Sequence, residues 1–301
     1  MSTAETIGFI GLGVMGGPMC RNMAKKHPGR VLMLDRDAAA LAALSDTKAE
    51  AATSLEALAA QAQVIFLSLP GGPQVEAVSA AIAQAARSGT TIVDLSTTPV
   101  ALARSVADRL RAKGLDFADA PVARTREAAQ RGELSIMVGA EAAVFARVKP
   151  LLHYIGSDVT HCGEVGCGQV VKLVNNALVF EHTLALAEMM VIGERAGVKP
   201  ETLLSAVSKG SGDSFVLRNH GTKAMLPRNF PEKAFPPEYV LKDLDYVLQL
   251  AADTGVRPAL AELARRYYDA ACRQGLSGRY FPGVIEFIEK GGAPDDGQAK
   301  V

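Results

Sequence analysis

The sequence has 301 residues, in which 32 Lys and Arg balance 32 Asp and Glu, with 49% hydrophobic and 21% charged residues. This length exceeds the usual size of a single core and predicts two domains, and the composition excludes a disordered or fibrous chain. A formal net charge of zero leaves no field that attracts nucleic acid or an anionic membrane, so neither is expected as a partner.

The sequence shows neither a targeting segment nor a disulfide framework. Its first residues lack a basic segment followed by an apolar one, and no stretch approaches the roughly 18 uninterrupted apolar residues that cross a bilayer. Four cysteines at unrelated spacings are typical of reduced thiols. We therefore expect a cytoplasmic protein without a membrane span.

In the first half of the chain, short apolar runs alternate with Ala-rich amphipathic segments. This alternation indicates crossover units and a parallel sheet, and runs that are apolar throughout indicate strands covered on both faces. The helix expected over residues 100–113 places apolar residues four apart on one stripe. The predicted strands are residues 6–10, 31–35, 64–69, 91–94, 117–119 and 134–138.

Beyond about residue 165 the pattern is helical, beginning with a long helix over residues 168–196. The further helices are predicted over residues 200–208, 239–254, 258–274 and 281–289. The predicted fold class is α/β: a Rossmann-type, doubly wound parallel sheet followed by an all-helical C-terminal domain. The expected boundaries are 1–163 for the dinucleotide-binding domain, 164–291 for the helical substrate and oligomerisation domain, and 292–301 for a flexible tail.

A glycine fingerprint follows the first predicted strand. Gly11 permits a tight turn, Gly13 lets the backbone approach a pyrophosphate, and Gly16 allows the next helix to pack closely on the strand. The start of that helix supplies unpaired amides for phosphate oxygens. The pattern therefore predicts a dinucleotide site rather than a plain strand-to-helix turn.

The end of the second predicted strand indicates which dinucleotide binds. Asp35 lies nineteen residues after Gly16, where an acidic side chain can accept both ribose hydroxyls and repels a 2′-phosphate. This favours NAD. The neighbouring Arg36 leaves NADP as the alternative, because a guanidinium can pair with that phosphate.

Lys172 interrupts an apolar run near the start of the long helix. A charged ammonium is expensive there unless it faces a cleft, and burial lowers the pKa of a lysine into the range useful for proton transfer. The alternative is a lysine that extends along the helix to water. Asn175, Asn176 and Val179 share its face at helical spacing and can present amide groups to one ligand.

Four ordered motifs carry a resemblance to a known family. They are Gly11 to Met19, Asp119-Ala120-Pro121-Val122, Gly166 to Asn176 around Lys172, and Lys242-Asp243-Leu244. Together they resemble the β-hydroxyacid dehydrogenases over nearly the whole chain. The resemblance implies a Rossmann domain, an all-helical domain that mediates a homodimer or homotetramer, and an active site in the cleft between them.

The resemblance also implies roles for individual residues. Lys172 protonates or hydrogen-bonds a carbonyl oxygen while the nicotinamide delivers hydride to the aldehyde carbon, and no metal is required. Asn175 and Asn176, with Val179 on the same face, position the substrate. The implied cofactor contacts are Leu12, Val14 and Met15 at the pyrophosphate, Asp35 and Arg36 at the ribose, Leu69, Pro70 and Thr97 at the nicotinamide half, and Lys242 from the helical domain.

One departure from the family bears on the substrate. Most members continue Asp-x-Pro-Val with Ser-Gly-Gly, whereas this chain has Ala123-Arg124-Thr125. An arginine there presents a planar donor fork to a terminal carboxylate, sulfonate or phosphate, and sulfolactaldehyde reductases look similar at this position. The alternative is that Arg124 forms a surface ion pair with Glu127.

The expected function is thus an NAD-dependent dehydrogenase or reductase of a small 3-hydroxy acid, or hydroxy-sulfonate, and its semialdehyde. Two alternatives are a redox-inactive dinucleotide-binding module and an imine reductase. His161, Cys162 and Cys167 lack the paired short spacings of a metal site, so no metal is expected.

Overall fold

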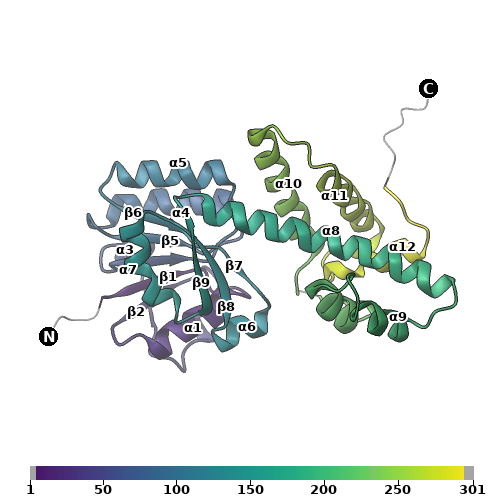
Figure 1. The fold of residues 1–301 in the computed structure, drawn as a ribbon. Helices are drawn as coiled ribbons and strands as arrows, with labels where there is room; N and C mark the ends of the chain where they lie inside the picture. Colours follow the sequence, from purple (N-terminus) through teal and green to yellow (C-terminus); the bar gives the residue numbers. More distant parts are fainter. Residues whose placement is uncertain (1–4, 233, 295–301) are drawn as a thin grey trace. The chain divides into compact units, whose positions relative to one another are not determined.

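A computed structural model describes residues 5–232 and 234–294 (Figure 1). Clustering of contacts divides the chain into two compact units, residues 1–172 and 173–301. The division falls inside helix α8 (Cys167–Arg195), and the boundary expected after residue 163 stays a prediction. Of the expected flexible tail, residues 295–301 lie outside the described residues.

Within the described part of the first unit, nine strands form one sheet in the order β3-β2-β1-β4-β5-β6-β8-β7, with β9 paired to β8. All pairs among the first six strands of this order are parallel, which gives the arrangement of a doubly wound dinucleotide-binding sheet. The antiparallel pairs are β6 with β8 and β7 with β8. The bounds are β1 (Ile7–Ile10), β2 (Val31–Leu34), β3 (Glu50–Ala51), β4 (Val64–Leu67), β5 (Thr91–Asp94), β6 (Asp116–Asp119), β7 (Val122–Ala123), β8 (Leu134–Gly139) and β9 (Gly156–Gly163).

The strand registers align the carboxyl ends of the central strands. Ile10 pairs with Leu34 and Leu67, Leu67 pairs with Asp94, and Asp94 pairs with Asp119. The segments that follow β1, β2, β4, β5 and β6 therefore leave the sheet at one edge, where open α/β sheets bind their ligands.

The two faces of the sheet carry separate cores because successive strand residues point to opposite sides. One core joins Ile7 and Phe9 to helices α1 and α7, and the other joins Ile10 and Ile65 to α3, α4 and α5. Figure 1 shows helices on both sides of the sheet. The helices of this unit are α1 (Gly16–Lys26), α2 (Ala38–Ala42), α3 (Leu55–Ala59), α4 (Gly72–Ala85), α5 (Val100–Arg111), α6 (Arg126–Arg131) and α7 (Ala142–Leu152).

The second unit is helical and encloses a core that includes Phe180, Tyr268 and Phe281. Its segment η1 is π-helical, which the sequence pattern did not predict, whereas the backbone of η2 leaves the helical conformation at Gln274 and Gly275. Its elements after α8 are α9 (Pro200–Val207), η1 (Leu217–Met225), α10 (Pro237–Thr254), α11 (Ala259–Ala271), η2 (Cys272–Leu276), η3 (Phe281–Gly283) and α12 (Val284–Glu289). The predicted fold class, a Rossmann domain followed by a helical domain, is confirmed.

Helix α8 is long and apolar enough to cross a membrane by length and composition alone, with 39% of the relevant window buried. Several of its side chains instead belong to protein cores, since Phe180, Leu184 and Met190 pack in the core of the second unit. The helix also holds the buried polar residues Asn176 and Thr183, which is typical of a core helix of a folded protein.

Candidate active site

The glycine loop between β1 and α1 has the geometry that a pyrophosphate requires. Gly11 has φ +93°, and a Cβ there would collide with the carbonyl oxygen of Ser68. A Cβ on Gly16 would collide with the carbonyl oxygen of Gly11. By contrast, a Cβ on Gly13 would meet no atom within 4 Å. Two glycines therefore allow close backbone packing, while the third leaves the backbone open to a ligand.

The residues between these glycines differ in exposure. Leu12 is buried in the core, Met15 is half-buried at the start of α1, and the Val14 side chain is 45% exposed. Of the residues expected at the pyrophosphate, Val14 is thus the most exposed, and its side chain is the most accessible to a ligand.

Asp35 follows β2 and lies beside the glycine loop. Its carboxylate accepts hydrogen bonds from the amides of Leu12, at 2.5 Å, and Asp37, at 2.8 Å. These bonds hold a half-buried carboxylate next to the loop, where an adenosine ribose lies in dinucleotide-binding sheets. The neighbouring Arg36 is exposed.

The segments after β4 and β5 are joined to each other. The amide of Leu69 donates to the hydroxyl oxygen of Ser96 at 2.9 Å. Leu69 and Thr97 are half-buried, and Pro70 is exposed. The structure therefore brings together, at the carboxyl edge of the sheet, the residues expected at the nicotinamide half of the cofactor.

A buried polar network lies behind these segments, and sequence reasoning did not identify it. Its five side chains are at most 5% exposed: Asp94, Ser96, Thr98, Asp119 and Gln169. The Asp94 carboxylate accepts from the Ser96 amide at 2.9 Å and from the Thr98 hydroxyl at 2.7 Å. The Asp119 carboxylate accepts from the amides of Gly166, at 2.6 Å, and Gln169, at 2.8 Å. Burial raises the pKa of Asp119 to about 7, although these two amides oppose the shift.

Two signals in the sequence could have found this network. Strands β5 and β6 both end in aspartate, at paired positions on adjacent strands, and a glutamine stands three residues before Lys172. A charged residue at the end of a buried strand needs partners, and the first amides of a helix are available donors.

Lys172 is half-buried near the start of α8. Its ammonium nitrogen donates to the carbonyl oxygen of Val122 at 2.7 Å. Val122 and Ala123 form β7, which leads directly into Arg124 and Thr125. Within the first unit, the lysine is therefore fastened to the strand that carries the expected substrate loop.

That loop has a strained backbone at Arg124, whose φ is +86°. The resemblance implies a glycine of Ser-Gly-Gly at this position, and glycine reaches positive φ without strain. The guanidinium donates to Glu133 O at 2.6 Å, to Ser157 Oγ at 2.9 Å and to Asp158 Oδ2 at 2.5 Å. Its ion pair is thus with Asp158 on β9, so the predicted alternative of a pair with Glu127 is not what the structure shows.

The remaining loop residues have structural surroundings of their own. Ala123 pairs with Ser135 of β8. Thr125 is the N-cap residue of α6, and its side-chain oxygen accepts from the amide of Ala128. Both residues set the path of the loop.

In the second unit, a chain of polar contacts joins the asparagines of α8 to α10. Asn175 donates to Asn176 at 3.1 Å, and Asn176 donates to the carboxylate of Asp243 at 2.7 Å. Asp243 also lies 3.2 Å from the ammonium of Lys242, which sits over the ring of Tyr246. Asp243 therefore connects two predicted ligand-binding positions, a role that sequence reasoning missed.

Val179, the third predicted position on this face of α8, packs partly buried against the core of the second unit.

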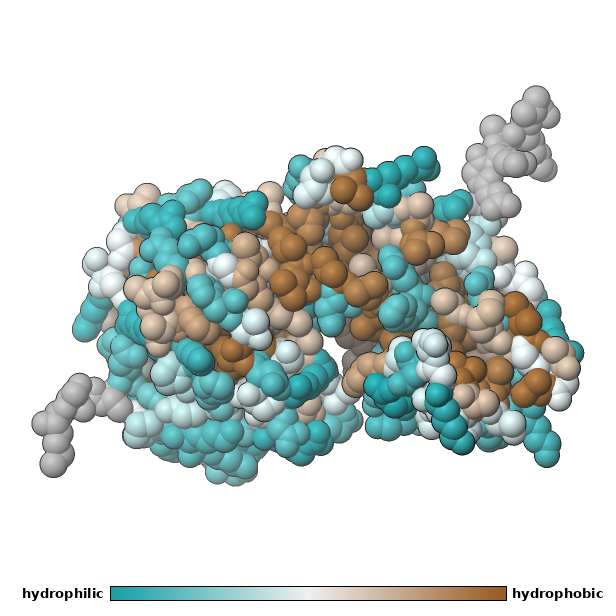
Figure 2. Space-filling model, viewed as in Figure 1, coloured by the Kyte–Doolittle hydropathy of each residue, from teal (hydrophilic) through white to brown (hydrophobic). Residues whose placement is uncertain are grey.

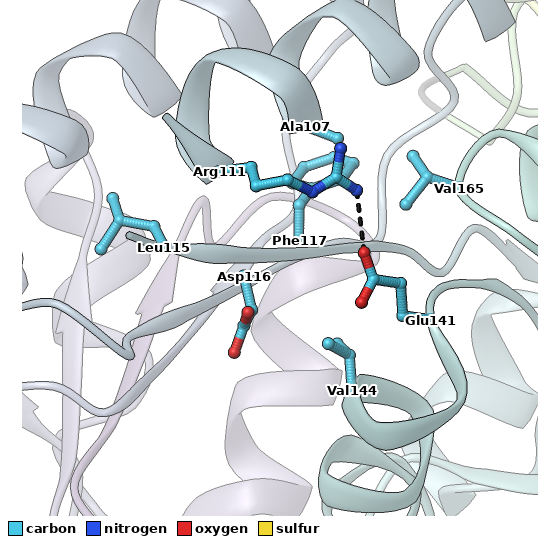
Figure 3. Close-up of a pocket in the computed structure, with 8 residues that line it drawn as sticks. All are labelled: Ala107, Arg111, Leu115, Asp116, Phe117, Glu141, Val144 and Val165. Atoms are coloured by element: carbon cyan, nitrogen blue, oxygen red, sulfur yellow. Dashed lines mark hydrogen bonds and ion pairs between the residues drawn. The ribbon is translucent and has the colours of Figure 1, made fainter. Parts of the chain in front are cut away.

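A cavity of about 20 Å³ lies in the first unit between α5, β6 and α7, and Figure 3 shows the side chains that line it. An ion pair at 3.0 Å, between Arg111 and Glu141, lies in its wall. It has room for about one water molecule, and none of the predicted site residues lines it. The cavity is therefore separate from the candidate active site. Among residues 5–232 and 234–294, no group of three or more His, Cys, Asp and Glu side chains is arranged to hold a metal ion.

A doubly wound sheet with an open glycine loop, an acidic residue beside it and a tethered lysine defines the class of dinucleotide-dependent oxidoreductases. Residues 6–163 match the family model for the NAD binding domain of 6-phosphogluconate dehydrogenase. Residues 166–288 match the model for the NAD-binding domain of NADP-dependent 3-hydroxyisobutyrate dehydrogenase.

Individual relatives agree with these matches. The chain is 34% identical to 2-(hydroxymethyl)glutarate dehydrogenase of Eubacterium barkeri, over 96% of this chain and 97% of that protein. It is 35% identical to 2-hydroxy-3-oxopropionate reductase of Escherichia coli, over 94% and 97%. The structure of Mycobacterium tuberculosis 3-hydroxyisobutyrate dehydrogenase with L-serine superposes with a TM-score of 0.84 at 26% identity, covering 95% and 99%.

The chain belongs to the β-hydroxyacid dehydrogenase family, and it is an NAD(P)-dependent oxidoreductase that acts on CH–OH groups.

Proposed function

We propose that this protein interconverts a small 3-hydroxy acid, or hydroxy-sulfonate, and its semialdehyde, with Lys172 as the general acid and base. The observation that carries the proposal is the bond from Lys172 Nζ to Val122 O, because it fastens a half-buried ammonium to the strand that begins the substrate loop. The relatives' names support the substrate class. 2-(Hydroxymethyl)glutarate and 2-hydroxy-3-oxopropionate each carry the reacting oxygen on the carbon β to a carboxylate.

The cofactor supplies or accepts the hydride when bound. In the reducing direction, Lys172 donates a proton from Nζ to the carbonyl oxygen as the aldehyde carbon gains the hydride. In the oxidising direction it takes the hydroxyl proton back. Val122 O accepts one of the three ammonium protons at 2.7 Å, which limits the rotation of Nζ. Asn175 and Asn176 are proposed to orient the substrate.

A matched pair of lysine variants tests this role. Lys172→Ala is expected to lower the rate of hydride transfer by about 10²- to 10⁴-fold while NADH still binds, because proton transfer by a positioned group contributes that much. Lys149→Ala changes a lysine of the same unit that lies over the ring of Phe145, and it is expected to keep the wild-type rate. The proposal is wrong if Lys172→Ala folds, binds NADH and retains most of the rate.

The substrate class is tested by a screen of NADH oxidation. Succinate, malonate, methylmalonate and tartronate semialdehydes and sulfolactaldehyde are the aldehydes to compare, and cyclic imines are the counter-screen. Turnover of imines without turnover of any acid semialdehyde would contradict the proposal.

Arg124 is proposed to bind the acid group of the substrate. Its three hydrogen bonds use three of the five N–H donors of a guanidinium, so two donors remain for an anion. Arg124→Gln is expected to raise KM for acid substrates about 10- to 100-fold, as loss of a charge-assisted bond does. Asp158→Asn breaks the same ion pair but keeps the guanidinium, so equal effects of both variants would show that Arg124 only shapes the loop.

NAD is proposed as the preferred cofactor, with NADP as the alternative. The support is Asp35, whose carboxylate is held beside the glycine loop by the amides of Leu12 and Asp37. A carboxylate there repels the 2′-phosphate of NADP. The test compares kcat/KM for NADH with kcat/KM for NADPH, using one substrate. A value for NADH below the value for NADPH would reverse the assignment.

A homodimer or homotetramer is proposed from one exposed face of α8. The large apolar residues on it follow one another at helical spacing and are each 41% to 59% exposed: Val171, Val174, Leu178, Met189 and Ile192. Figure 2 shows apolar side chains gathered along the course of this helix. Such a stripe indicates a protein interface. Leu178→Glu is expected to dissociate the oligomer in light scattering, whereas Leu260→Glu on α11 is not.

With its four cysteines free, the protein is proposed to work in the cytoplasm.

A further inference from the structure

The start of α8 is held by a side chain from the central sheet. Asp119, the last residue of β6, accepts the amides of Gly166, at 2.6 Å, and Gln169, at 2.8 Å. The first amides of a helix have no partner within the helix, and a carboxylate at this end also interacts favourably with the helix dipole. Asp119 therefore fixes the first turn of α8 against the carboxyl edge of the sheet.

Gln169 makes a second connection from the same turn. Its Oε1 accepts the amide of Thr98 at 3.0 Å, and its Nε2 donates to the carbonyl oxygen of Ser96 at 2.8 Å. Ser96 and Thr98 flank Thr97 in the sequence, and the Ser96 hydroxyl oxygen accepts a hydrogen bond from the amide of Leu69. One fully buried glutamine thus ties α8 directly to the segment around Thr97 and, through the Ser96 hydroxyl, to the segment of Leu69.

The proposed general acid lies one helical turn after this glutamine. Lys172 is three residues beyond Gln169 in the sequence. Its ammonium is bonded to Val122 O, and Val122 is three residues beyond Asp119. All of these contacts lie within residues 1–172. The position of Lys172 relative to the Leu69 and Thr97 segments is therefore set by hydrogen bonds through Asp119 and Gln169.

The packing around Asp119 leaves little freedom for another arrangement. A Cβ on Gly168 would collide with the carbonyl oxygen of Met137 and lie 2.8 Å from Asp119 Oδ2. A Cβ on Gly139 would lie 2.5 Å from Asp119 Oδ1 and 2.8 Å from the amide of Gly168. Two glycines on different elements thus make room for one carboxylate. A buried polar network with every bond made fixes a single geometry.

We propose that Asp119 and Gln169 form a clamp that sets the position of the Lys172 ammonium relative to the nicotinamide half of the cofactor. Gln169 is accordingly a positioning residue for hydride transfer. This inference rests on the proposed role of Lys172. It expects a variant without the Gln169 bonds to bind the cofactor normally and to transfer hydride slowly, because a small displacement of a catalytic group lowers the rate strongly.

Gln169→Met tests the clamp, since methionine fills the space without making either hydrogen bond. The single-turnover rate of hydride transfer is expected to fall by about 10- to 100-fold, with the Kd for NADH within about threefold of wild type. Gln63→Met is the matched control. Gln63 accepts the amide of Thr6 at the opposite edge of the same sheet, so its loss is expected to leave the rate unchanged. Equal rates in the two variants would overturn the clamp.

Gln169→Glu gives a readout that a purely structural role does not move, and it serves where Gln169→Met does not fold. A protonated glutamic acid can accept from Thr98 N and donate to Ser96 O as glutamine does, whereas the ionised form cannot donate. The rate relative to wild type is therefore expected to rise as the pH falls. Dividing by the wild-type rate removes the titration of Asp119, which both proteins share. A ratio that stays flat between about pH 5.5 and about pH 8.5 would overturn the clamp.

Lys172→Ala separates this inference from the proposed function. An active Lys172→Ala variant contradicts the proposed function itself. An inactive Lys172→Ala variant beside fully active Gln169→Met and Gln169→Glu variants contradicts only the clamp.

Discussion

Replacing Asp119 with asparagine removes a carboxyl that is fully buried at the end of β6. Burial raises its pKa from the ordinary 3.8 to about 7, with the Gly166 and Gln169 amides opposing the shift and Asp94 adding to it. The folded state therefore holds the proton more tightly than the unfolded chain does. The stability that this proton contributes is fully present below about pH 4 and is lost as the pH rises through about 7, a change of roughly 4 kcal/mol.

The experiment compares the free energies of unfolding of wild type and Asp119→Asn at about pH 5 and about pH 8. Groups shared by the two proteins cancel in the difference, so the advantage of wild type over the variant is expected to shrink by roughly 2 to 3 kcal/mol over this interval. Urea unfolding followed by circular dichroism measures it.

Two further measurements make this test specific. Because the chain has two compact units, hydrogen exchange at the Gly166 and Gln169 amides locates the effect within the first of them. Asp116→Asn is the control, since it removes an exposed carboxyl at the other end of the same strand. A wild-type advantage that is the same at both pH values would refute the reasoning.

Three other predictions concern the loops of the first unit. Asp35→Asn is expected to move the NADPH to NADH ratio of kcat/KM toward NADPH by about tenfold, because it removes a charge that repels the 2′-phosphate. Gly13→Ala is expected to fold and to lose cofactor affinity in NADH titrations, whereas Gly16→Ala is expected to lower the thermal midpoint, since of these two positions Gly16 is the one at which a Cβ would collide with backbone. Arg124→Gly is expected to keep the thermal midpoint within about 3 °C of wild type, because relief of the positive φ offsets the loss of an exposed ion pair. Arg124→Val is expected to have a lower thermal midpoint than Arg124→Gly, because it loses the ion pair and keeps the strain.

The sequence pattern predicted the parts of the fold that depend on local hydrophobicity. The six predicted strands correspond to β1, β2, β4, β5, β6 and β8, and the long helix begins one residue from its predicted start. Strand β9 was missed because its residues are mostly polar and its side chains mostly exposed, so it lacks the apolar run of a covered strand. Strand β7 has two residues, too few to form a pattern.

Side chains whose role depends on neighbouring strands were harder to predict. Gln169 bonds to Asp119 and to the segment after Asp94 because strands β5 and β6 are adjacent and α8 starts beside their ends. A single aspartate at the end of a strand is also typical of a turn or a solvent contact. The motif around Lys172 identified the segment, but the function of each polar residue in it depends on contacts across about seventy residues of sequence.

The partner of Arg124 was predicted wrongly because strand β9 was not predicted. Without β9, the nearest acidic residue in the sequence was Glu127, and a pair with it was the natural structural alternative to substrate binding. The structure instead places Asp158 of β9 against the guanidinium, with Ser157 and the Glu133 carbonyl beside it. The positive φ and the three bonds show that Arg124 shapes the loop, and this effect is separable from the anion binding proposed for it. Because Asp158→Asn affects only the first and Arg124→Gln affects both, their comparison divides the two contributions.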